Sequence, residues 1–214
     1  MVEGILCVDK PSGLTSHDVV SRIRRLANTR KVGHGGTLDP LATGLLVVAI
    51  GRATRLLEYV LGQPKEYQAL VRLGQTSNTY DAEGEIVESG EVDVTPSQMA
   101  GALGQFRGDI WQTPPMFSAV KRQGKPLYEL ARQGVAVERQ ARQVTIYELE
   151  LLSFEEPDVR LRVRCSSGTY IRSLAHDLGE RLGSGAYLAG LQRVAVGSFR
   201  LRDAAVLQTC LLYT

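Results

Sequence analysis

Residues 33–55 read GHGGTLDPLATGLLVVAIGRATR, a glycine-rich loop that runs into an unbroken apolar stretch. Residues 45–50 are leucines, β-branched residues and one alanine, which is typical of a central strand covered on both faces. The loop before this stretch holds one acid, Asp39, followed by Pro40. Because proline restricts the residue before it to extended backbone, Asp39 has little conformational freedom. The residues predict a buried strand with a single carboxylate ahead of it, although an isolated Asp-Pro pair is more typical of an ordinary turn.

The rest of the chain predicts strands with helices between them. Alternating or continuous apolar residues predict strands over residues 5–8, 67–73, 85–87, 144–154 and 159–165. Helical spacing and start signals predict helices over residues 15–26, 53–61, 95–106, 126–134 and 170–182. Residues 76–84 are polar and rich in turn formers, which indicates a loop. This order favours an α+β (mixed α/β) fold, with a mixed, largely antiparallel sheet that carries helices.

Length and cysteine content limit the class of protein. At 214 residues the chain is long enough for one large domain or two small ones, with a single domain as the default, and a core of that size needs no disulfide or metal. Cys7, Cys165 and Cys210 contain no close pair, so they outline neither a disulfide framework nor a zinc site. The start of the chain lacks a signal-peptide pattern, and no apolar run reaches membrane-spanning length. We therefore expect a cytoplasmic protein that does not contact membranes.

The formal net charge is only +2 at pH 7, so composition alone does not identify a nucleic-acid-binding protein. The placement of the basic residues is more informative. One cluster precedes the glycine-rich loop and comprises Arg22, Arg24, Arg25, Arg30 and Lys31. A second comprises Lys121, Arg122, Lys125, Arg132, Arg139 and Arg142, whereas acids gather over residues 81–93. This uneven distribution of charge is expected of a protein surface that binds phosphate. Arginines exposed to solvent on ordinary helices would give the same distribution.

Six blocks of sequence occur in a characteristic order. They are LCVDKPSGLTSHDVV (6–20), GHGGTLDPLATG (33–44), KEYQALVRLGQTS (65–77), DAEGEIV (81–87), RGDIWQTPPMFSAVKRQGKPLYELARQG (107–134) and CSSGTYIRSLAHDLGERLG (165–183). Together they resemble the TruB family of pseudouridine synthases. The resemblance implies the pseudouridine-synthase fold, in which helices flank the sheet and a central RNA-binding cleft crosses it.

The resemblance also implies a domain organisation. One catalytic domain is expected over residues 1–200, in which residues 115–142 form a thumb-like RNA-binding insertion. A short tail is expected over residues 201–214. Enzymes of this type usually carry a small C-terminal RNA-binding PUA domain, and we expect no room for one here.

The activity implied by the resemblance is that of a transfer RNA pseudouridine synthase, an isomerase that converts uridine 55 in the T loop after flipping the base out of the RNA. Such an enzyme needs no cofactor or metal, and we expect a monomer without an obligate protein partner. Its catalytic residues would be Asp39, Arg172 and Tyr67. Arg172 pairs with the Asp39 carboxylate, while Tyr67 stacks on the base and is a candidate proton acceptor. From the residues alone, Arg172 fits an exposed helix residue and Tyr67 a core aromatic.

Substrate-binding positions also follow from the resemblance. His34 is expected to fill the space left by the extruded base, and Leu191 to line the uracil pocket. Without the resemblance, a lone histidine is more often structural, and a leucine in an apolar run fits a core equally well. The remaining substrate-binding positions are Gly36, Thr37, Lys121 and Tyr170.

Other residues in these blocks are assigned structural roles. Lys10 and Pro11 are expected to support the catalytic loop from beneath, and His17 and His176 to be hydrogen-bonded structural residues. Asn78 departs from the family, which more commonly has an acid at that position, so the resemblance assigns no role to its side chain.

Four other functions fit the sequence less well. A glycosidase or nucleosidase would need a second acid at a defined distance from Asp39, and the sequence shows none near it. A non-catalytic RNA-binding module would not need Asp39 or Arg172, and both are present. A phosphate-binding nucleotide enzyme would need a GK[ST] or GxGxxG signature, and the sequence contains neither. Metal catalysis would need ligands at helical or hairpin spacing, which the sequence also lacks.

Overall fold

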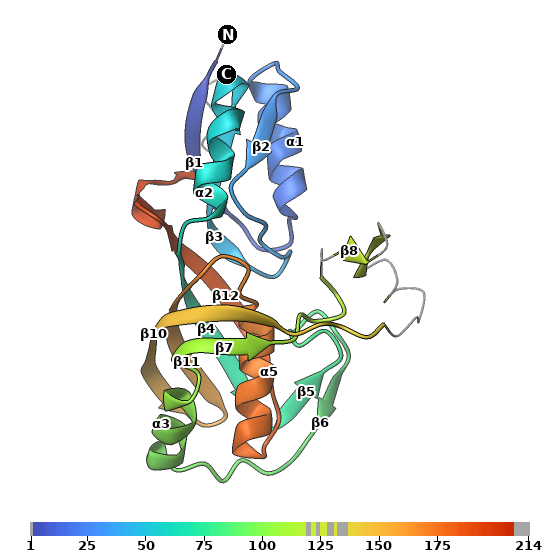
Figure 1. The fold of residues 1–214 in the computed structure, drawn as a ribbon, viewed down its shortest axis with the longest axis vertical. Helices are drawn as coiled ribbons and strands as arrows, with labels where there is room; N and C mark the ends of the chain where they lie inside the picture. Colours follow the sequence, from blue (N-terminus) through green and yellow to red (C-terminus); the bar gives the residue numbers. More distant parts are fainter. Residues whose placement is uncertain (1, 119–120, 123–124, 128–130, 132–136, 208–214) are drawn as a thin grey trace. The chain divides into compact units, whose positions relative to one another are not determined.

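The computed structural model describes residues 2–118, 121–122, 125–127, 131 and 137–207 (Figure 1). The chain divides into two compact units, of which the first comprises residues 1–68 and 191–214 and the second residues 69–190. Strands β4 (Lys65–Leu73) and β12 (Ala186–Val196) each run across a boundary between the units. The second unit is therefore an insertion into the sequence of the first.

The first unit is built around β3 (Thr43–Ile50), the strand predicted from the apolar run. β3 pairs antiparallel with β1 (Gly4–Lys10) and with β2 (Val32–His34). Its start pairs in parallel with β12. Two short strands, β13 (Phe199–Arg200) and β14 (Ala205–Val206), pair with β12 and β1 respectively. The sheet is thus mixed, as expected.

Both faces of β3 are covered by apolar side chains. On one face Leu46 and Val48 belong to a buried cluster that includes Val19, Val20 and Ile23 from helix α1 (Ser16–Leu26). On the other face Leu45 and Val47 pack in a cluster with Val60 and Val196. This arrangement confirms the prediction of a doubly covered central strand.

Two helices begin at the residues that the sequence indicates. Before α1, the Thr15 hydroxyl accepts from the N–H of Asp18 at 3.0 Å, and the Asp18 carboxylate accepts from the N–H of Thr15 at 2.9 Å. Before α3 (Pro96–Gly104), Thr95 and Gln98 exchange the same pair of bonds. Both N-termini are capping boxes, which satisfy backbone donors that the first turn leaves unpaired.

The helix predicted over residues 53–61 ends at the predicted residue, but it begins earlier and its first part is of another helical type. The structure has a 3₁₀ segment, η1 (Gly51–Leu56), followed by a short helix, α2 (Leu57–Leu61). The Thr54 hydroxyl donates to the carbonyl oxygen of Gly51 at 2.9 Å, three residues back. This local bond, together with the lack of a side-chain cap, favours the tighter turn at the start.

The second unit contains the strand order β12-β4-β11-β10-β7. β10 (Arg142–Glu155) and β11 (Asp158–Cys165) form the long antiparallel pair predicted from alternation, and β7 (Gly108–Gln112) lies antiparallel to β10. Val159, Leu161, Val163 and Cys165 are buried while the arginines between them face outward, as expected. Helix α5 (Ile171–Leu182), close to its predicted bounds, packs with α3.

Several elements differ from the sequence predictions. The loop predicted over residues 76–84 begins inside β5 (Gln75–Ser77), which pairs with β6 (Ile86–Glu88). Pro126 ends β9 (Lys125–Pro126), which pairs with β8 (Lys121–Arg122), and the described residues that follow it in the predicted helix, Leu127 and Ala131, are helical. Gly134, the predicted end of that helix, lies outside the described residues, as does part of the thumb-like insertion and the end of the tail. The sequence analysis did not predict β7 and β12.

Candidate active site

Asp39 lies on the loop between β2 and β3 and is half-buried, so it is not sealed in the interior. Its neighbours on both sides are anchored. The N–H and the carbonyl oxygen of buried Leu38 both bond the hydroxyl of Ser16, at 2.8 and 3.1 Å. The carbonyl oxygen of Pro40 accepts from the N–H of Gly13 at 2.9 Å. The loop therefore presents Asp39 between two fixed points.

Lys10 braces the same loop from the end of β1. Its side chain is fully buried, and Nζ donates to the carbonyl oxygens of Pro11 at 2.9 Å, Leu14 at 2.6 Å and Pro40 at 3.3 Å. A buried ammonium is costly unless its donors are satisfied, and these carbonyls satisfy them. The contact with Pro40 agrees with the structural role expected of Lys10.

His34 ends β2, five residues before Asp39, and is half-buried. Its Nδ1 accepts from the N–H of Gly36 at 3.3 Å, which requires an unprotonated Nδ1 and leaves the ring proton on Nε2. Burial lowers the pKa of His34 below its ordinary value, and the positive charge of Arg193 lowers this pKa further. The imidazole is therefore neutral at pH 7.

The glycines of the loop make room for close approach. A Cβ on Gly35 would lie 2.4 Å from Cγ1 of Val60, so no side chain fits there. Gly36 has φ +130°, a conformation that residues with side chains rarely adopt. Thr37, the next residue, is exposed. The loop thus reaches solvent at Thr37, beside the half-buried Gly36.

Two more predicted site residues belong to the first unit. Tyr67 lies in β4 with 8% of its surface exposed, in the inward-facing row with Lys65 and Ala69. Leu191 lies in β12 and is half-buried, and its carbonyl oxygen accepts from the hydroxyl of Thr43 at 3.4 Å. That bond ties Leu191 to the strand that follows the Asp39 loop.

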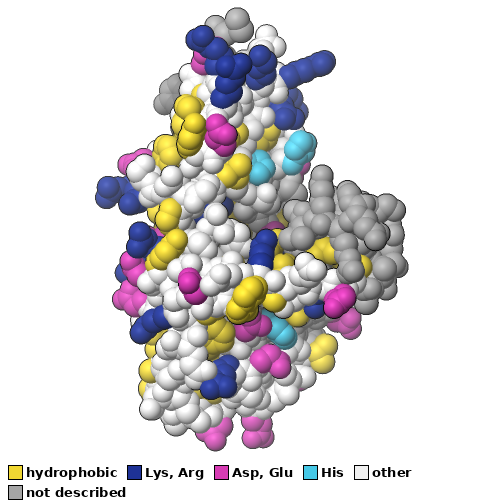
Figure 2. Space-filling view, viewed as in Figure 1, with side chains coloured by type: hydrophobic (Ala, Val, Ile, Leu, Met, Phe, Trp, Pro, Cys, Tyr) yellow, Lys and Arg dark blue, Asp and Glu magenta, His cyan; other side chains and the backbone are white. Residues whose placement is uncertain are grey.

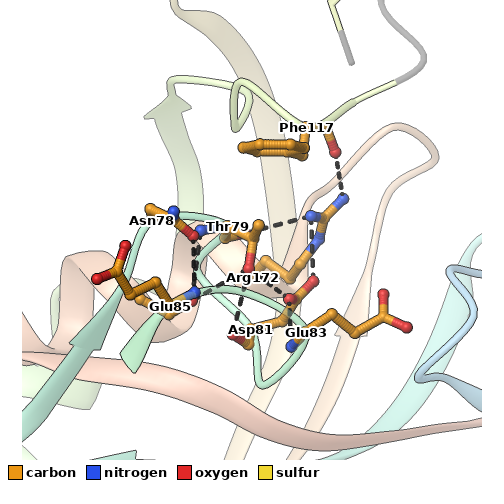
Figure 3. A network of polar contacts seen from close by, with 8 residues as sticks. Asn78, Thr79, Asp81, Glu83, Glu85, Phe117 and Arg172 are labelled. Atoms are coloured by element: carbon orange, nitrogen blue, oxygen red, sulfur yellow. Dashed lines mark hydrogen bonds and ion pairs between the residues drawn. The ribbon is translucent and has the colours of Figure 1, made fainter. Parts of the chain in front are cut away.

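In the second unit, Arg172 occupies the first turn of α5 and is buried, with 5% of its surface exposed. Its Nη1 lies 3.1 Å from Oδ2 of Asp81 and donates to the carbonyl oxygen of Thr79 at 3.2 Å (Figure 3). Its Nη2 donates to the carbonyl oxygen of Phe117 at 2.9 Å. Arg172 is therefore not the exposed helix residue that the residues alone would allow.

Asp81 is the carboxylate that fixes this guanidinium, and 1% of it is exposed. Its Oδ1 accepts from the Thr79 hydroxyl at 2.6 Å and from the N–H of Glu83 at 3.0 Å (Figure 3). The amide oxygen of Asn78 accepts from the N–H of Glu85 at 3.1 Å, so this side chain closes the loop. The Asn78 side chain thus has a local structural role that the resemblance did not assign.

Tyr80 joins Thr79 to Asp81 in a left-handed conformation, with φ +66°. Its ring stacks on His176 at a centroid distance of 3.9 Å and an angle of 7°. Its carbonyl oxygen accepts from the N–H of Leu188 at 3.0 Å. Such a backbone costs free energy in a non-glycine residue, and the stack and the hydrogen bond hold it in place.

Tyr170 is the N-cap residue of α5 and is half-buried. The amide of buried Gln112 bonds it twice, donating to its carbonyl oxygen at 2.8 Å and accepting from its N–H at 2.7 Å. The guanidinium of Arg142 lies 4.7 Å from the ring centroid. Lys121 lies in β8, and its side chain is outside the described part of the structure.

The predicted site residues are divided between the two units. His34, Gly36, Thr37, Asp39, Tyr67 and Leu191 belong to the first unit, and Lys121, Tyr170 and Arg172 belong to the second. Sequence reasoning missed the burial of Arg193 and Gln112 and the role of Asp81 as a partner of Arg172. Asp81 begins DAEGEIV (81–87), one of the six blocks that carry the resemblance. Its place in that block was the sequence signal that could have identified its role.

Across the described residues, no three His, Cys, Asp or Glu side chains are grouped as metal ligands would be. In the same part of the chain, no helix combines the length and the apolar character that crossing a bilayer requires.

The chain is similar in sequence and in fold to known proteins. Residues 24–171 match the model of the "TruB family pseudouridylate synthase (N terminal domain)". The chain is 50% identical to "tRNA pseudouridine synthase B" of Aeromonas salmonicida over 198 residues, which cover 92% of this chain and 62% of that protein. It is 50% identical to the protein of the same name from Azoarcus sp. over 97% of this chain and 69% of that protein. The chain thus spans less than two thirds of the first relative.

Solved structures of similar fold include a chain in the "Crystal Structure of a Cbf5-Nop10-Gar1 Complex", with a TM-score of 0.76 and 36% identity. The match covers 96% of this chain and 52% of that one. A chain in the "Structure of H/ACA RNP bound to a substrate RNA containing 2'-deoxyuridine" matches with a TM-score of 0.73 and 33% identity, over 96% of this chain and 51% of that one. These matches confirm the expected fold class. The chain therefore belongs to the TruB family of pseudouridylate synthases.

Proposed function

We propose that this chain isomerises uridine to pseudouridine in transfer RNA, with uridine 55 of the T loop as its target. Membership of the family supports the type of reaction, and the names of the curated relatives support transfer RNA as the substrate. The observation that carries the proposal is the single, half-buried carboxylate of Asp39 on a loop anchored at both neighbours.

The proposed reaction breaks the N1–C1′ bond, turns the base while it is held, and joins C5 to C1′. C5 loses its proton and N1 gains one, so the atoms balance without an oxidant, a reductant or a group donor. We assign cleavage of the glycosidic bond to the Asp39 carboxylate and acceptance of the C5 proton to Tyr67. One carboxylate, instead of the pair that a glycosidase uses, favours rearrangement over hydrolysis.

Arg172 is assigned as the partner of Asp39, as the resemblance implies. A guanidinium can bind a carboxylate through two parallel hydrogen bonds, which orient the carboxylate and keep it ionised. The bonds that Arg172 donates to Thr79 and Phe117 and its ion pair with Asp81 support this role, because they hold Arg172 in one orientation before any substrate binds. A preorganised cation spends no free energy on reorientation during the reaction.

His34 and Leu191 are assigned to the flipped nucleotide. Extruding a uridine costs a few kcal/mol of lost stacking unless protein groups replace those contacts. A neutral imidazole can stack in the vacated space without the hydration that an imidazolium would lose. The lowered pKa of His34 keeps the ring in that neutral state. Leu191 supplies an apolar wall for the uracil.

The other assigned RNA contacts use what the loop and the second unit offer. Gly36 and Thr37 let the RNA backbone approach closely, because Gly36 has no side chain and Thr37 is exposed. Tyr170 offers a ring that stacks near the Arg142 guanidinium, on a backbone that Gln112 holds. Lys121 is assigned to a phosphate, as its place in the basic thumb-like insertion implies.

A cationic end of the first unit extends the proposed RNA interface. Arg25, Arg30, Lys31 and Arg55 are exposed, and none of them forms an ion pair with a described carboxylate. The N–H of Gly51 donates to the carbonyl oxygen of Lys31 at 2.8 Å, which brings η1 beside the turn between α1 and β2. Figure 2 shows Lys and Arg side chains gathered at the upper end of the view. Unpaired cations in such a group attract phosphate.

Substituting Arg30 and Lys31 with Gln is expected to weaken RNA binding and to reduce the salt slope by about 1 to 2, because each lost phosphate contact removes about 0.9 from the slope. The rate at saturating RNA should not change. Binding of a T-loop hairpin measured from low to moderate salt tests this. Arg164→Gln is the matched control, since Arg164 already pairs with Glu148 on an exposed strand. An unchanged slope in the double variant would show that this end does not bind RNA.

The function itself is tested by incubating the protein with total transfer RNA and mapping pseudouridine at every position. We expect new pseudouridine at position 55 and release of the C5 hydrogen in equal amount. Modification at another position would correct the target, and no modification in any RNA would refute the activity. No cofactor is added, because the proposed chemistry needs none.

A further inference from the structure

Arg193 is a buried arginine that lies against the Asp39 loop in the first unit. Only 1% of it is exposed, although it lies in a strand near the surface residue Arg200. Its Nε donates to the carbonyl oxygen of Leu45 at 2.8 Å. Its Nη2 donates to the carbonyl oxygen of Gly36 at 3.0 Å, and its Nη1 to that of Thr37 at 3.3 Å. One guanidinium thus joins the start of β3 to the loop that carries Asp39.

The partners of Arg193 in the described structure are carbonyl oxygens, and no described carboxylate pairs with it. Burying a guanidinium without a counter-ion is costly, and an apolar side chain would fill the same space at lower cost. A planar guanidinium offers several donors in a fixed arrangement, which a flexible lysine does not. The three bonds therefore point to a role in fixing backbone positions rather than in stabilising the core.

The backbone around Arg193 leaves little freedom for movement. A Cβ on Gly44, which pairs with Arg193 across β3 and β12, would lie 2.4 Å from the carbonyl oxygen of Arg193. A Cβ on Gly36 would lie 3.5 Å from Nη1 of Arg193. Both glycines have positive φ, +93° and +130°. Gly44 therefore lies too close to the Arg193 backbone to carry a side chain, whereas a Cβ on Gly36 would make an ordinary contact with the guanidinium.

Gly36 connects Arg193 to His34. Its carbonyl oxygen accepts from Arg193, while its N–H donates to Nδ1 of His34 at 3.3 Å. The carbonyl oxygen and the N–H of Gly36 belong to two peptide groups, which the φ and ψ torsions of Gly36 join, so a bond that fixes the carbonyl group limits the directions open to the N–H. The bond from Arg193 to Gly36 thus bears on the bond that Nδ1 of His34 accepts.

We propose that Arg193 is a positioning residue, which fixes the Gly36–Thr37 backbone and through it both the presentation of Asp39 and the Nε2–H form of His34. The inference rests on the proposed function for its effect on catalysis, but its effect on His34 is independent of any activity. Burial and then the charge of Arg193 lower the pKa of His34, and His17 is the other charged group that lowers it.

The test compares Arg193→Met, Arg193→Lys and wild type. We expect kcat to fall about 100-fold in the Met variant and about 10-fold in the Lys variant, since small displacements of a reacting group cost up to that much. KM for the RNA should stay within twofold, because Arg193 is buried and offers almost no surface for binding. A loss confined to KM, or a kcat within twofold of wild type in both variants, would overturn the proposal.

The second readout is the titration of His34 by NMR, with the signal assigned through His34→Gln because the chain has three histidines. In wild type, Nδ1 should be the unprotonated nitrogen, and the pKa should lie below the ordinary value. The Met variant should raise the pKa and lose the single tautomer, whereas the Lys variant should keep the lowered pKa because it keeps the charge. A His34 titration that is identical in wild type and the Met variant would overturn the proposal.

Arg200→Met is the matched control. Arg200 also donates to two carbonyl oxygens, those of Gly197 and Phe199, but it is exposed. The Arg200→Met variant should leave kcat and the His34 titration unchanged. If the Met variant does not fold, the kcat and the His34 titration of the Lys variant decide whether Arg193 is a positioning residue. If neither variant folds, Arg193 is a core residue and the positioning role is refuted. If wild type makes no pseudouridine, the proposed function fails while the titration still decides the effect on His34.

Discussion

We expect Asp39→Asn to abolish pseudouridine formation, with a loss of about 10,000-fold or more, because single catalytic carboxylates contribute on that scale. Asparagine has nearly the volume of aspartate but cannot be ionised, so it can neither attack nor stabilise positive charge on the sugar. The residue is half-buried and its neighbours hold the loop, so the fold should tolerate the change. Release of tritium from C5-labelled uridine in a T-loop transcript measures the loss.

Binding of the RNA should survive in Asp39→Asn, which separates chemistry from recognition. The matched control is Asp203→Asn, an exposed acid of the first unit, which should keep full activity. Turnover of Asp39→Asn within tenfold of wild type would remove Asp39 from the reaction. A variant that no longer binds RNA would instead place Asp39 in recognition.

Arg172→Met is expected to destabilise the protein by about 3 to 5 kcal/mol, because it leaves the buried carboxylate of Asp81 without its cation. Only 6% of the Arg172 side chain and 2% of the Asp81 side chain are exposed, so water cannot replace the partner. The free energy of unfolding in urea measures this loss. Adding Asp81→Asn should recover much of it, because the second change removes the unpaired charge.

Arg172→Lys tests the catalytic side of the same residue. Lysine keeps the charge but lacks the planar pair of donors, so we expect kcat to fall about 100-fold while the protein stays folded. Arg164→Met breaks an exposed pair with Glu148 and should cost less than about 1 kcal/mol. A stable, fully active Arg172→Met would contradict both expectations.

Local signals in the sequence predicted much of the fold. The capping boxes at Thr15 and Thr95 are contained in four consecutive residues each, so they can be read without knowledge of the fold. The alternation in β11 likewise follows from the period of a strand. The burial of both faces of β3 was predictable, because a strand with an unbroken apolar run would expose apolar side chains to water if either face were uncovered.

The partners of the buried charges could not be predicted in the same way. Arg172 and Asp81 are 91 residues apart in the numbering, and Arg193 bonds residues that precede it by about 150. Such pairs depend on topology and leave no local pattern. β12 was missed because Gly190 and Gln192 interrupt its apolar residues, and its position in the sheet, not its own pattern, stabilises it.

The insertion of residues 69–190 into the first unit has a consequence for synthesis on the ribosome. β1, β2 and β3 emerge early, but β12, β13 and β14, which complete their sheet, emerge more than a hundred residues later. Until then the open edges of β1 and β3 are templates for pairing with another nascent chain. A chain that ends before residue 191 should therefore aggregate instead of folding into a smaller protein, because residues 1–68 lack the strands that complete their sheet.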